Sequence, residues 1–311
     1  MNVLLIGLGK IAYKYDLSLD QPNEYFSVTH LSAARKAGFQ TIGGIDTNVD
    51  ARILFQKHTG IPAWANISQI PKSTRIDVVV ICTPPESHLG AILEVFHSFS
   101  PKVIICEKPF AGNGHHSRQI IEKCKSQMAA LFVNYTRQFS QGFTNFQQFI
   151  NAEDFRKGCF YYNYGLQNSG SHYLRMILEL LGVPESVERA LTKGEALNPQ
   201  FTLRYSQGRE FYFIPSPIIN TRVADAFIET QNFLGHIYNG NYFRVTQAKG
   251  EDEKIRWEYE QKLISEGNFF GGLDNLYSTI LSKRNTDDAS IDRACSYDQL
   301  CNEILDNLKF N

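Results

Sequence analysis

A lysine stands where a short apolar run ends, and a proline follows it directly. Val103-Ile104-Ile105 leads into Cys106, after which Glu107-Lys108-Pro109 closes the run. A lysine that is partly desolvated near another positive charge has a lowered pKa and can take part in general acid–base chemistry. The proline disfavours helical geometry at Lys108 and stiffens the loop. We interpret Lys108 as a candidate proton carrier, with an exposed loop lysine as the alternative.

A second candidate is His172, within NSGSHYLRMILELL. The apolar spacing predicts a helix over 169–181. Asn168 and His172 are four residues apart and would share one face if the helix begins early. Asn168 can orient a hydroxyl group but cannot take a proton, and it also suits a helix N-cap. The alternative for His172 is a histidine of the core or the surface.

A glycine pattern near the N-terminus suggests a nucleotide site. Gly7-Leu8-Gly9-Lys10-Ile11-Ala12 has the form GxGxxA and follows the first apolar run. Gly7 would allow a tight turn, Gly9 would let backbone N–H groups approach a pyrophosphate, and Ala12 would pack closely on a sheet. The pattern predicts cofactor contacts from Gly7, Gly9, Lys10, Ile11 and Ala12. The alternative is a glycine-rich turn without a ligand.

Asp46, in GGIDTN, is the candidate for the acidic residue at the end of the second strand. Its carboxylate could accept both ribose hydroxyl groups and would repel a 2′-phosphate, which favours NAD over NADP. Arg52 is near enough in sequence to leave NADP open. The segment 13–28 looks inserted, and it is either a surface loop or a segment that folds over the cofactor or the substrate.

The elements that must position these residues fall into two groups. In the predicted first domain, 1–136, buried-type strands alternate with helical patterns such as His88–His97 and Ser117–Met128. Strands without polar alternation indicate a parallel sheet covered by helices, which is typical of a doubly wound Rossmann domain. The five predicted strands are Val3–Gly7, Gln40–Asp46, Val78–Thr83, Val103–Glu107 and Ala130–Tyr135.

The predicted second domain, 137–311, is of the α+β class. Ile228–Tyr238 and Tyr242–Gln247 flank Asn239-Gly240, a strong hairpin signal. We expect an open, mainly antiparallel sheet with helices on one face. The other predicted elements are strands at Leu203–Tyr205 and Phe211–Phe213 and helices at Ser169–Leu181, Leu273–Leu281 and Tyr297–Leu308.

Composition excludes several classes of function. The 311 residues carry a net charge of −1 without a basic block, which argues against binding to nucleic acid or an anionic membrane. No apolar run approaches the roughly 20 residues of a membrane span, and VLLIG is too short for a signal peptide. Six scattered cysteines indicate a reduced, cytoplasmic protein. His115-His116 lacks further ligands at metal-binding spacing, so we expect no metal.

Four motifs occur in one order along the chain: GLGKIA, CTPPESH at 82–88, ICEKPF, and NSGSH at 168–172. Together they resemble the Gfo/Idh/MocA family of glucose–fructose oxidoreductase and inositol dehydrogenase relatives. The resemblance implies a Rossmann domain followed by a domain with an open sheet. It also implies hydride transfer between NAD(P) and a hydroxyl or keto carbon, most often of a sugar, cyclitol or sugar nucleotide.

The resemblance assigns roles residue by residue. Thr83 and Pro84 match a turn that lines the cofactor, and His88 matches the histidine after it, with a structural capping role as an equal alternative. Glu107 and Lys108 match the EKP signature, whose lysine lies near the nicotinamide and the substrate hydroxyl. Asn168 stands where relatives commonly carry an acidic residue that works with the histidine matched by His172. Arg175 also stands where relatives frequently carry an acidic residue.

NYTRQF, at 134–139, also resembles the family. Asn134 would lie near the nicotinamide and contact the substrate, and Arg137 could bind a substrate oxygen or phosphate, with an interdomain ion pair as the alternative. Tyr164 could contact a sugar, although aromatic packing is the default for it and for Tyr162.

Two functions remain open from the sequence. The first is an NAD(P)-dependent oxidoreductase that acts on a small-molecule carbohydrate as a homodimer or homotetramer built through the C-terminal sheet. The second is a non-catalytic regulatory protein that responds to a dinucleotide or a sugar. The missing acid at Asn168 favours the second, whereas Lys108 and His172 together favour the first.

Overall fold

The chain folds into two compact units in the computed structural model, which describes residues 1–18, 25–190, 197–218, 220–248, 261–282 and 289–308. The N-terminal unit comprises Met1–Thr136 and Gly271–Glu303, and the C-terminal unit comprises Arg137–Phe270 and the chain from Ile304. The predicted division after residue 136 therefore differs from the structure in one respect. Residues 271–303 return to the N-terminal unit, because helix α8 packs against helix α2 there.

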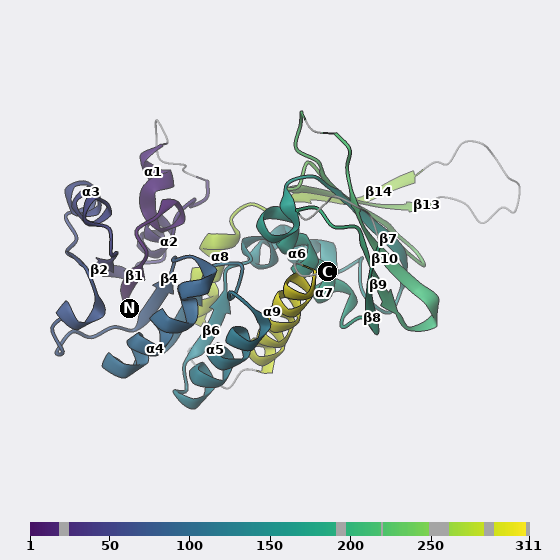
Figure 1. The fold of residues 1–311 in the computed structure, drawn as a ribbon. Coiled ribbons are helices and arrows are strands. Elements are labelled where there is room, and N and C mark those ends of the chain that lie inside the picture. The colour runs from purple at the N-terminus through teal and green to yellow at the C-terminus, as the bar shows by residue number, and fades with distance from the viewer. Residues whose placement is uncertain (19–24, 191–196, 219, 249–260, 283–288, 309–311) are drawn as a thin grey trace, which may run out of the picture. The chain divides into compact units, whose positions relative to one another are not determined.

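The N-terminal unit contains a six-stranded parallel sheet with the order β3-β2-β1-β4-β5-β6 (Figure 1). This is the strand order of a Rossmann fold, as predicted. All four residues of β4, β5 and β6 are buried, which explains their uninterrupted apolar sequences. The strands are β1 (Asn2–Ile6), β2 (Gln40–Ile45), β3 (Ala63–Trp64), β4 (Val78–Ile81), β5 (Val103–Cys106) and β6 (Ala130–Val133).

Helices of the N-terminal unit follow most of these strands. A π-helix, η1 (Lys10–Lys14), follows the glycine turn and continues as α1 (Tyr15–Leu17). The others are α2 (His30–Lys36), α3 (Val49–Thr59), α4 (His88–Ser98), α5 (Gly114–Ser126), α8 (Gly272–Ser282), α9 (Ala289–Asn307, which runs on into the C-terminal unit) and the 3₁₀ turns η2 (Ile67–Gln69) and η3 (Pro85–Ser87). The 3₁₀ turn η4 (Thr136–Phe139) begins at the last residue before the C-terminal unit.

The C-terminal unit contains an eight-stranded sheet with the order β14-β13-β12-β11-β7-β10-β9-β8. All neighbouring strands are antiparallel except β7 and β10, which confirms the mainly antiparallel sheet. The strands are β7 (Phe155–Tyr162), β8 (Ser186–Arg189), β9 (Phe201–Tyr205), β10 (Arg209–Pro215), β11 (Ala224–Thr230), β12 (Leu234–Tyr238), β13 (Tyr242–Ala248) and β14 (Gln261–Asn268).

The predicted turn at Asn239-Gly240 lies in the three-residue connection between β12 and β13, and both residues have positive φ angles, which asparagine and glycine tolerate best. The single strand predicted over Ile228–Tyr238 was wrong, because a turn divides it into β11 and β12. Thr230 fixes that turn, since its Oγ1 accepts a hydrogen bond of 2.9 Å from the backbone N–H of Phe233.

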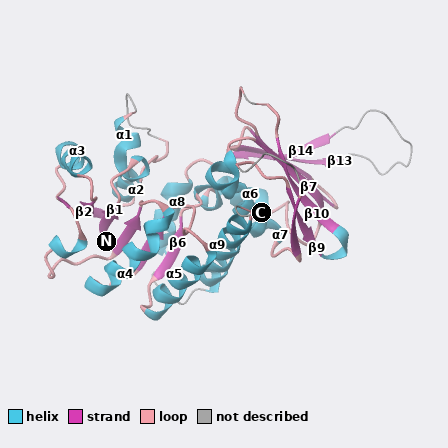
Figure 2. Ribbon diagram, viewed as in Figure 1, coloured by secondary structure: helices cyan, strands magenta, loops and turns pink. Residues whose placement is uncertain are grey.

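One face of this sheet carries the helices α6 (Gln141–Gln147) and α7 (Ser171–Leu181), as Figure 2 shows. The register places Phe160, Ala226, Ile237 and Phe243 in one row on the same face. At one end of this row, Phe160 stacks on Tyr173 of α7 with 4.2 Å between ring centroids.

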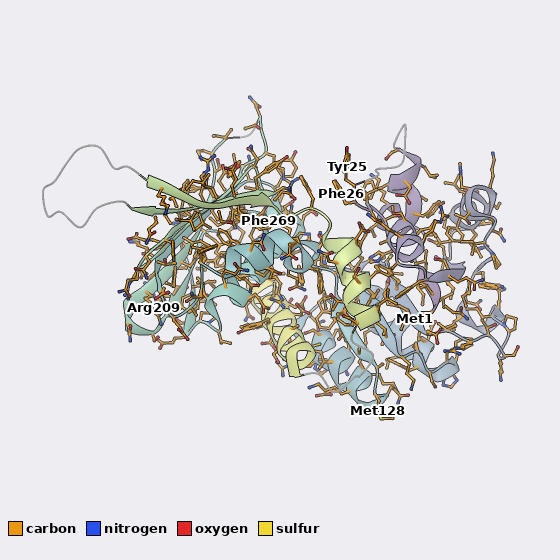
Figure 3. The ribbon with its side chains drawn as sticks, turned by 180° about the vertical axis from the view of Figure 1, so that it is seen from behind. Met1, Tyr25, Phe26, Met128, Arg209 and Phe269 are labelled. Atoms are coloured by element: carbon orange, nitrogen blue, oxygen red, sulfur yellow. The ribbon has the colours of Figure 1, made fainter. Side chains whose placement is uncertain are left out.

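At the other end, Phe243 packs against Phe146 of α6 and against Phe269, labelled in Figure 3. The helices of one face thus bury the apolar half of the alternating strands. The remaining short helical turns of this unit are the π-helix η5 (Gly165–Gly170) and η6 (Ser206–Gly208).

Candidate functional site

The glycine turn after β1 has the geometry of a diphosphate site. Gly7 has φ +88°, and a Cβ atom there would lie 2.8 Å from the carbonyl group of Cys82, so only glycine fits. Among the residues that the structure describes, a Cβ atom at Gly9 would meet nothing within 4 Å. Helix η1 begins immediately afterwards without an acidic residue in its first turn. The open space at Gly9 therefore faces a helix start that suits the phosphates of a dinucleotide.

Asp46 connects the end of β2 to this turn. Its Oδ2 accepts a hydrogen bond of 2.8 Å from the backbone N–H of Leu8, and its Oδ1 accepts one of 2.8 Å from that of Asn48. Arg52 donates from Nη1 to the main-chain oxygens of Asp46 and Thr47, at 2.8 and 2.9 Å. Arg52 thus stabilises the loop after β2.

The remaining residues of the predicted cofactor set lie around the same turn. In η1, Lys10 is exposed, Ile11 is half-buried and Ala12 is fully buried against the sheet. Thr83, just after β4, adjoins Gly7, since its backbone nitrogen would lie 2.9 Å from a Cβ atom there. Its buried Oγ1 makes no hydrogen bond within the described residues. That hydroxyl, together with the open space at Gly9, fits a bound dinucleotide.

His88 is fully buried and holds two loops together. Its Nε2 lies 2.8 Å from the carbonyl oxygen of Thr83, and its Nδ1 lies 2.9 Å from that of Phe110. Pro84, beside Thr83, is exposed. The structure therefore favours the structural alternative for His88, which connects the Thr83–Pro84 turn to the loop that follows Lys108.

Lys108 is half-buried directly after β5, and the peptide bond between Lys108 and Pro109 is cis. Its neighbour Glu107 is 8% exposed. Glu107 Oε1 lies 3.0 Å from His30 Nε2 and accepts a hydrogen bond of 2.5 Å from Asn134 Nδ2. Glu107 Oε2 accepts a hydrogen bond of 3.3 Å from the backbone N–H of Lys108.

The carboxyl group of Glu107 is held in its ionised form. Burial by itself would raise its pKa, but the hydrogen bond and charge of His30, the hydrogen bond from Asn134 and the charge of Lys108 together lower the pKa below its ordinary value. An anion therefore lies buried beside the amide of Lys108.

Asn134 was predicted to contact the substrate, and the structure shows its amide nitrogen bonded to Glu107. Its Oδ1 is buried and makes no hydrogen bond within the described residues. His30 and Tyr277, whose hydroxyl lies 3.1 Å from His30 Nδ1, were not predicted. Thr29, which forms a capping box with Ser32, indicates that a helix starts at His30, but it does not indicate the contact of His30 with Glu107.

The second predicted cluster lies in the C-terminal unit. Asn168 is exposed in the π-helix η5, and His172 is 9% exposed in the first turn of α7. Asn168 is not a helix N-cap, because η5 already continues into α7, whose N-cap position is Gly170. Arg175 is fully buried and pairs with Glu179 at 2.8 Å.

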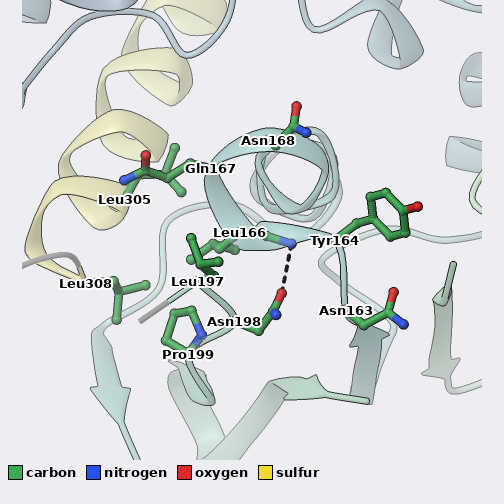
Figure 4. A pocket seen from close by; sticks show the side chains of 11 residues that line it. Asn163, Tyr164, Leu166, Gln167, Asn168, Leu197, Asn198, Pro199, Leu305 and Leu308 are labelled. Atoms are coloured by element: carbon green, nitrogen blue, oxygen red, sulfur yellow. Dashed lines mark hydrogen bonds between the residues drawn. The ribbon is translucent and has the colours of Figure 1, made fainter. Parts of the chain in front are cut away.

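A pocket of about 490 Å³ adjoins η5 in the same unit (Figure 4). Its wall is fixed by a hydrogen bond of 2.8 Å from the backbone N–H of Gly165 to Asn198 Oδ1. The lining consists of uncharged side chains and glycine: amides, one phenol and apolar groups. These residues are Asn163, Tyr164, Gly165, Leu166, Gln167, Asn168, Leu197, Asn198, Pro199, Leu305 and Leu308.

Tyr164 and Arg137 have different surroundings. Tyr164 is 52% exposed at this pocket, and the guanidinium group of Arg222 lies 5.2 Å from its ring centroid. Arg137 donates to the main-chain oxygen of Gly240 and to Asn241 Oδ1, both at 3.0 Å. Arg137 therefore stabilises the turn between β12 and β13. These hydrogen bonds differ from the interdomain ion pair that was the predicted alternative.

Three further observations concern the described part of the chain. No group of three or more His, Cys, Asp or Glu side chains there could hold a metal ion. None of the helices described is long and apolar enough to cross a membrane. The six cysteines are free thiols.

Comparison with known proteins agrees with this geometry. Residues 1–135 match the sequence model of the GFO_IDH_MocA oxidoreductase family, described as an NAD-binding Rossmann fold. Residues 1–135, which are less than half of the chain, are therefore similar to this family. The match agrees with the predicted resemblance over the N-terminal domain, and the matched family binds NAD.

Two curated relatives match this chain over less than half of their own length. An uncharacterized oxidoreductase of Schizosaccharomyces pombe is 24% identical over 160 residues, which are 45% of this chain and 43% of the relative. Inositol 2-dehydrogenase 2 of Paenarthrobacter aurescens is 26% identical over 136 residues, which are 38% and 40% of the two chains.

Solved structures share the fold over nearly the whole chain. UDP-N-acetylglucosamine 3-dehydrogenase GnnA of Acidithiobacillus ferrooxidans superposes with a TM-score of 0.73 at 13% identity, covering 100% of this chain and 99% of that one. An Agrobacterium radiobacter oxidoreductase in complex with NAD⁺, L-tartaric acid and magnesium superposes with a TM-score of 0.69 at 13% identity, covering 99% and 94%.

Proposed function

We propose that this Gfo/Idh/MocA protein transfers a hydride between NAD and a secondary alcohol or ketone carbon of a sugar, cyclitol or sugar nucleotide. The observation that carries the proposal is the environment of Lys108. This lysine follows β5 and Glu107 in a unit that also holds the glycine turn, and its amide is bonded to the buried, ionised carboxylate of Glu107. A proton carrier needs such a fixed position.

NAD, when bound, supplies the hydride acceptor or donor. The chain supplies binding and proton handling. Gly7, Gly9 and the start of η1 would hold the diphosphate, and Thr83 would offer its free hydroxyl. Lys108 Nζ would take the proton of the reacting hydroxyl group, or return it in the reverse direction.

Two residues of the C-terminal unit complete the proposal. Asn168 would orient the hydroxyl group, since an amide can donate and accept hydrogen bonds. His172 would carry the proton onward. Both roles follow from the family resemblance and from the helical arrangement of η5 and α7, which brings residues four apart close to one face.

The carbohydrate substrate class rests on two kinds of support. Amides, a tyrosine hydroxyl and leucines line the pocket at η5, a combination that can bind hydroxyl groups and an apolar sugar face without a charged partner. Relatives of similar fold or sequence include a UDP-N-acetylglucosamine 3-dehydrogenase and an inositol 2-dehydrogenase. NAD is favoured over NADP because the carboxylate of Asp46 lies at the glycine turn.

The oligomeric state and the location also belong to the proposal. The sheet face opposite α6 and α7 carries part-exposed aromatic side chains, among them Tyr161, Phe227 and Tyr242. Such a face suits a homodimer or a homotetramer. A cytoplasmic location stays a prediction from the free cysteines.

The test is an absorbance assay at the NADH band with purified protein. NAD⁺ is mixed with myo-inositol and UDP-N-acetylglucosamine, and NADH is mixed with a panel of keto-sugars. Turnover with any member supports the proposal. Binding of NADH without turnover in the whole panel contradicts it and favours the regulatory alternative, for which Asn168 in place of an acid is the supporting feature.

A further inference from the structure

A chain of buried polar groups leads away from Lys108 into the N-terminal unit. Glu107 Oε1 lies 3.0 Å from His30 Nε2, and His30 Nδ1 lies 3.1 Å from the hydroxyl oxygen of Tyr277. His30 and Tyr277 are both fully buried. Buried polar groups are costly unless they are hydrogen-bonded, so these hydrogen bonds compensate for the burial of the three side chains.

The direction of the hydrogen bond to Glu107 follows from chemistry. Burial raises the pKa of Tyr277 well above its ordinary value, so the phenol keeps its proton and can donate. The ionised carboxylate of Glu107 can only accept. His30 therefore donates from Nε2 to Glu107, and the hydroxyl group of Tyr277 holds the ring in place at Nδ1.

The two helices that carry this chain are joined at a second point. Lys36 of α2 pairs with Asp274 of α8 at 2.8 Å, and Asp274 Oδ2 also accepts a hydrogen bond of 3.1 Å from the backbone N–H of Ser27. Tyr277 lies three residues after Asp274, so both face α2 from one side of α8. The end of the segment 13–28 and the start of α2 are thus anchored on α8.

We propose that His30, oriented by Tyr277, is a positioning residue for the turn that carries Lys108. The carboxylate of Glu107 transmits the effect, because one of its oxygens is held by His30 while the other accepts the backbone N–H of Lys108. Without His30, only Asn134 would hold the first oxygen, so the carboxylate could rotate more easily and weaken the second bond. The catalytic significance of this placement rests on the proposed function.

The experiment measures the position of Lys108 without a substrate. Wild type and variants are treated briefly with N-hydroxysuccinimidyl acetate, and mass spectrometry gives the acetylation rate of half-buried Lys108 relative to exposed Lys102. In His30→Leu we expect the ratio to rise by about threefold or more, because the turn opens more often. Tyr277→Phe, which removes only the hydroxyl group, should raise it in the same direction by less.

Two variants separate positioning from general disruption. His30→Gln keeps a donor for Glu107 and should restore a ratio close to that of the wild type. His97→Leu makes the same type of replacement at an exposed position of α4 and should leave the ratio unchanged. Thermal unfolding confirms that each variant is folded during labelling. If His30→Leu is not folded at the labelling temperature, Tyr277→Phe decides the question alone.

An unchanged ratio in folded His30→Leu, or in Tyr277→Phe where that variant decides, overturns the proposal. An equal rise in His30→Leu and His30→Gln also overturns it, since the hydrogen bond would then be irrelevant. Where turnover is measurable, His30→Leu should lower kcat by about tenfold while the Kd for NADH changes by less than about twofold. Altered labelling in a protein without turnover would contradict the proposed function and leave the positioning role supported.

Discussion

His30 and Glu107 belong to different elements, yet His30 Nε2 lies 3.0 Å from Glu107 Oε1 and both side chains are buried. An ionised carboxylate is costly to bury unless hydrogen bonds and opposite charge compensate for the lost water. Here His30, Asn134 and the amide of Lys108 supply that compensation. The fold therefore places a stabilised anion directly beside the lysine on which the proposed chemistry depends.

Glu107→Gln should make the free energy of unfolding depend less on pH in the acidic range. The folded-state pKa of Glu107 is lowered, so its contribution to the free energy of unfolding is present above the unfolded-state pKa and is lost as the pH falls through the folded-state value. At pH 7 we expect the variant to be less stable by about 1–3 kcal/mol. Urea unfolding should show that this difference shrinks below about pH 4.5.

Glu122→Gln, at an exposed position of α5, is the matched control and should change little at either pH. A stability difference for Glu107→Gln that stays constant between pH 7 and pH 4 would mean that its carboxyl group is not held ionised by the fold.

Gly9→Ala should separate cofactor binding from folding. A Cβ atom at Gly9 meets no atom of the described residues within 4 Å, so the free energy of unfolding should change by less than about 1 kcal/mol. The same methyl group would occupy the space that the pyrophosphate needs, and NADH should bind about tenfold more weakly or worse. NADH fluorescence titration and thermal unfolding measure the two quantities.

Gly7→Ala is the contrasting variant, because its Cβ atom would clash with Cys82 at a positive φ angle and should destabilise the fold itself. Wild-type NADH affinity in Gly9→Ala would show that the diphosphate does not lie at this turn.

Asp46→Asn should weaken the preference for NAD. The neutral amide no longer repels a 2′-phosphate, so the ratio of the Kd for NADPH to the Kd for NADH should fall by about tenfold. Asp50→Asn, at an exposed position in the first turn of α3, removes the same charge and serves as the control. An equal effect in both variants would show that net charge, and not the contact of Asp46 with the ribose, sets the preference.

Local sequence patterns were sufficient for much of the fold. The apolar runs of β4, β5 and β6 are buried on both faces, so their sequences differ clearly from the alternating strands of the C-terminal unit. Gly7 and Gly9 were found because a tight turn and a close backbone approach need glycine at fixed positions. These features depend only on neighbouring residues.

Features that depend on distant residues were not predicted. His30 contacts Glu107 and Tyr277, which are far away in the chain, and no local pattern distinguishes it from a surface histidine. The return of α8 to the N-terminal unit has the same origin, since packing against α2 decides it. The π-helix before α7 also has no recognisable sequence signal, which is why Asn168 could be taken for an N-cap.

The central claim is that Lys108 carries the proton, and the turnover of Lys108→Ala tests it most directly. Using the best substrate of the carbohydrate panel, kcat should fall by about 100-fold or more while NADH binds as in the wild type, because general acid–base catalysis typically contributes that much. Lys102→Ala, at an exposed position before β5, should keep full activity. Undiminished turnover in a folded Lys108→Ala protein that still binds NADH would contradict the proposed mechanism.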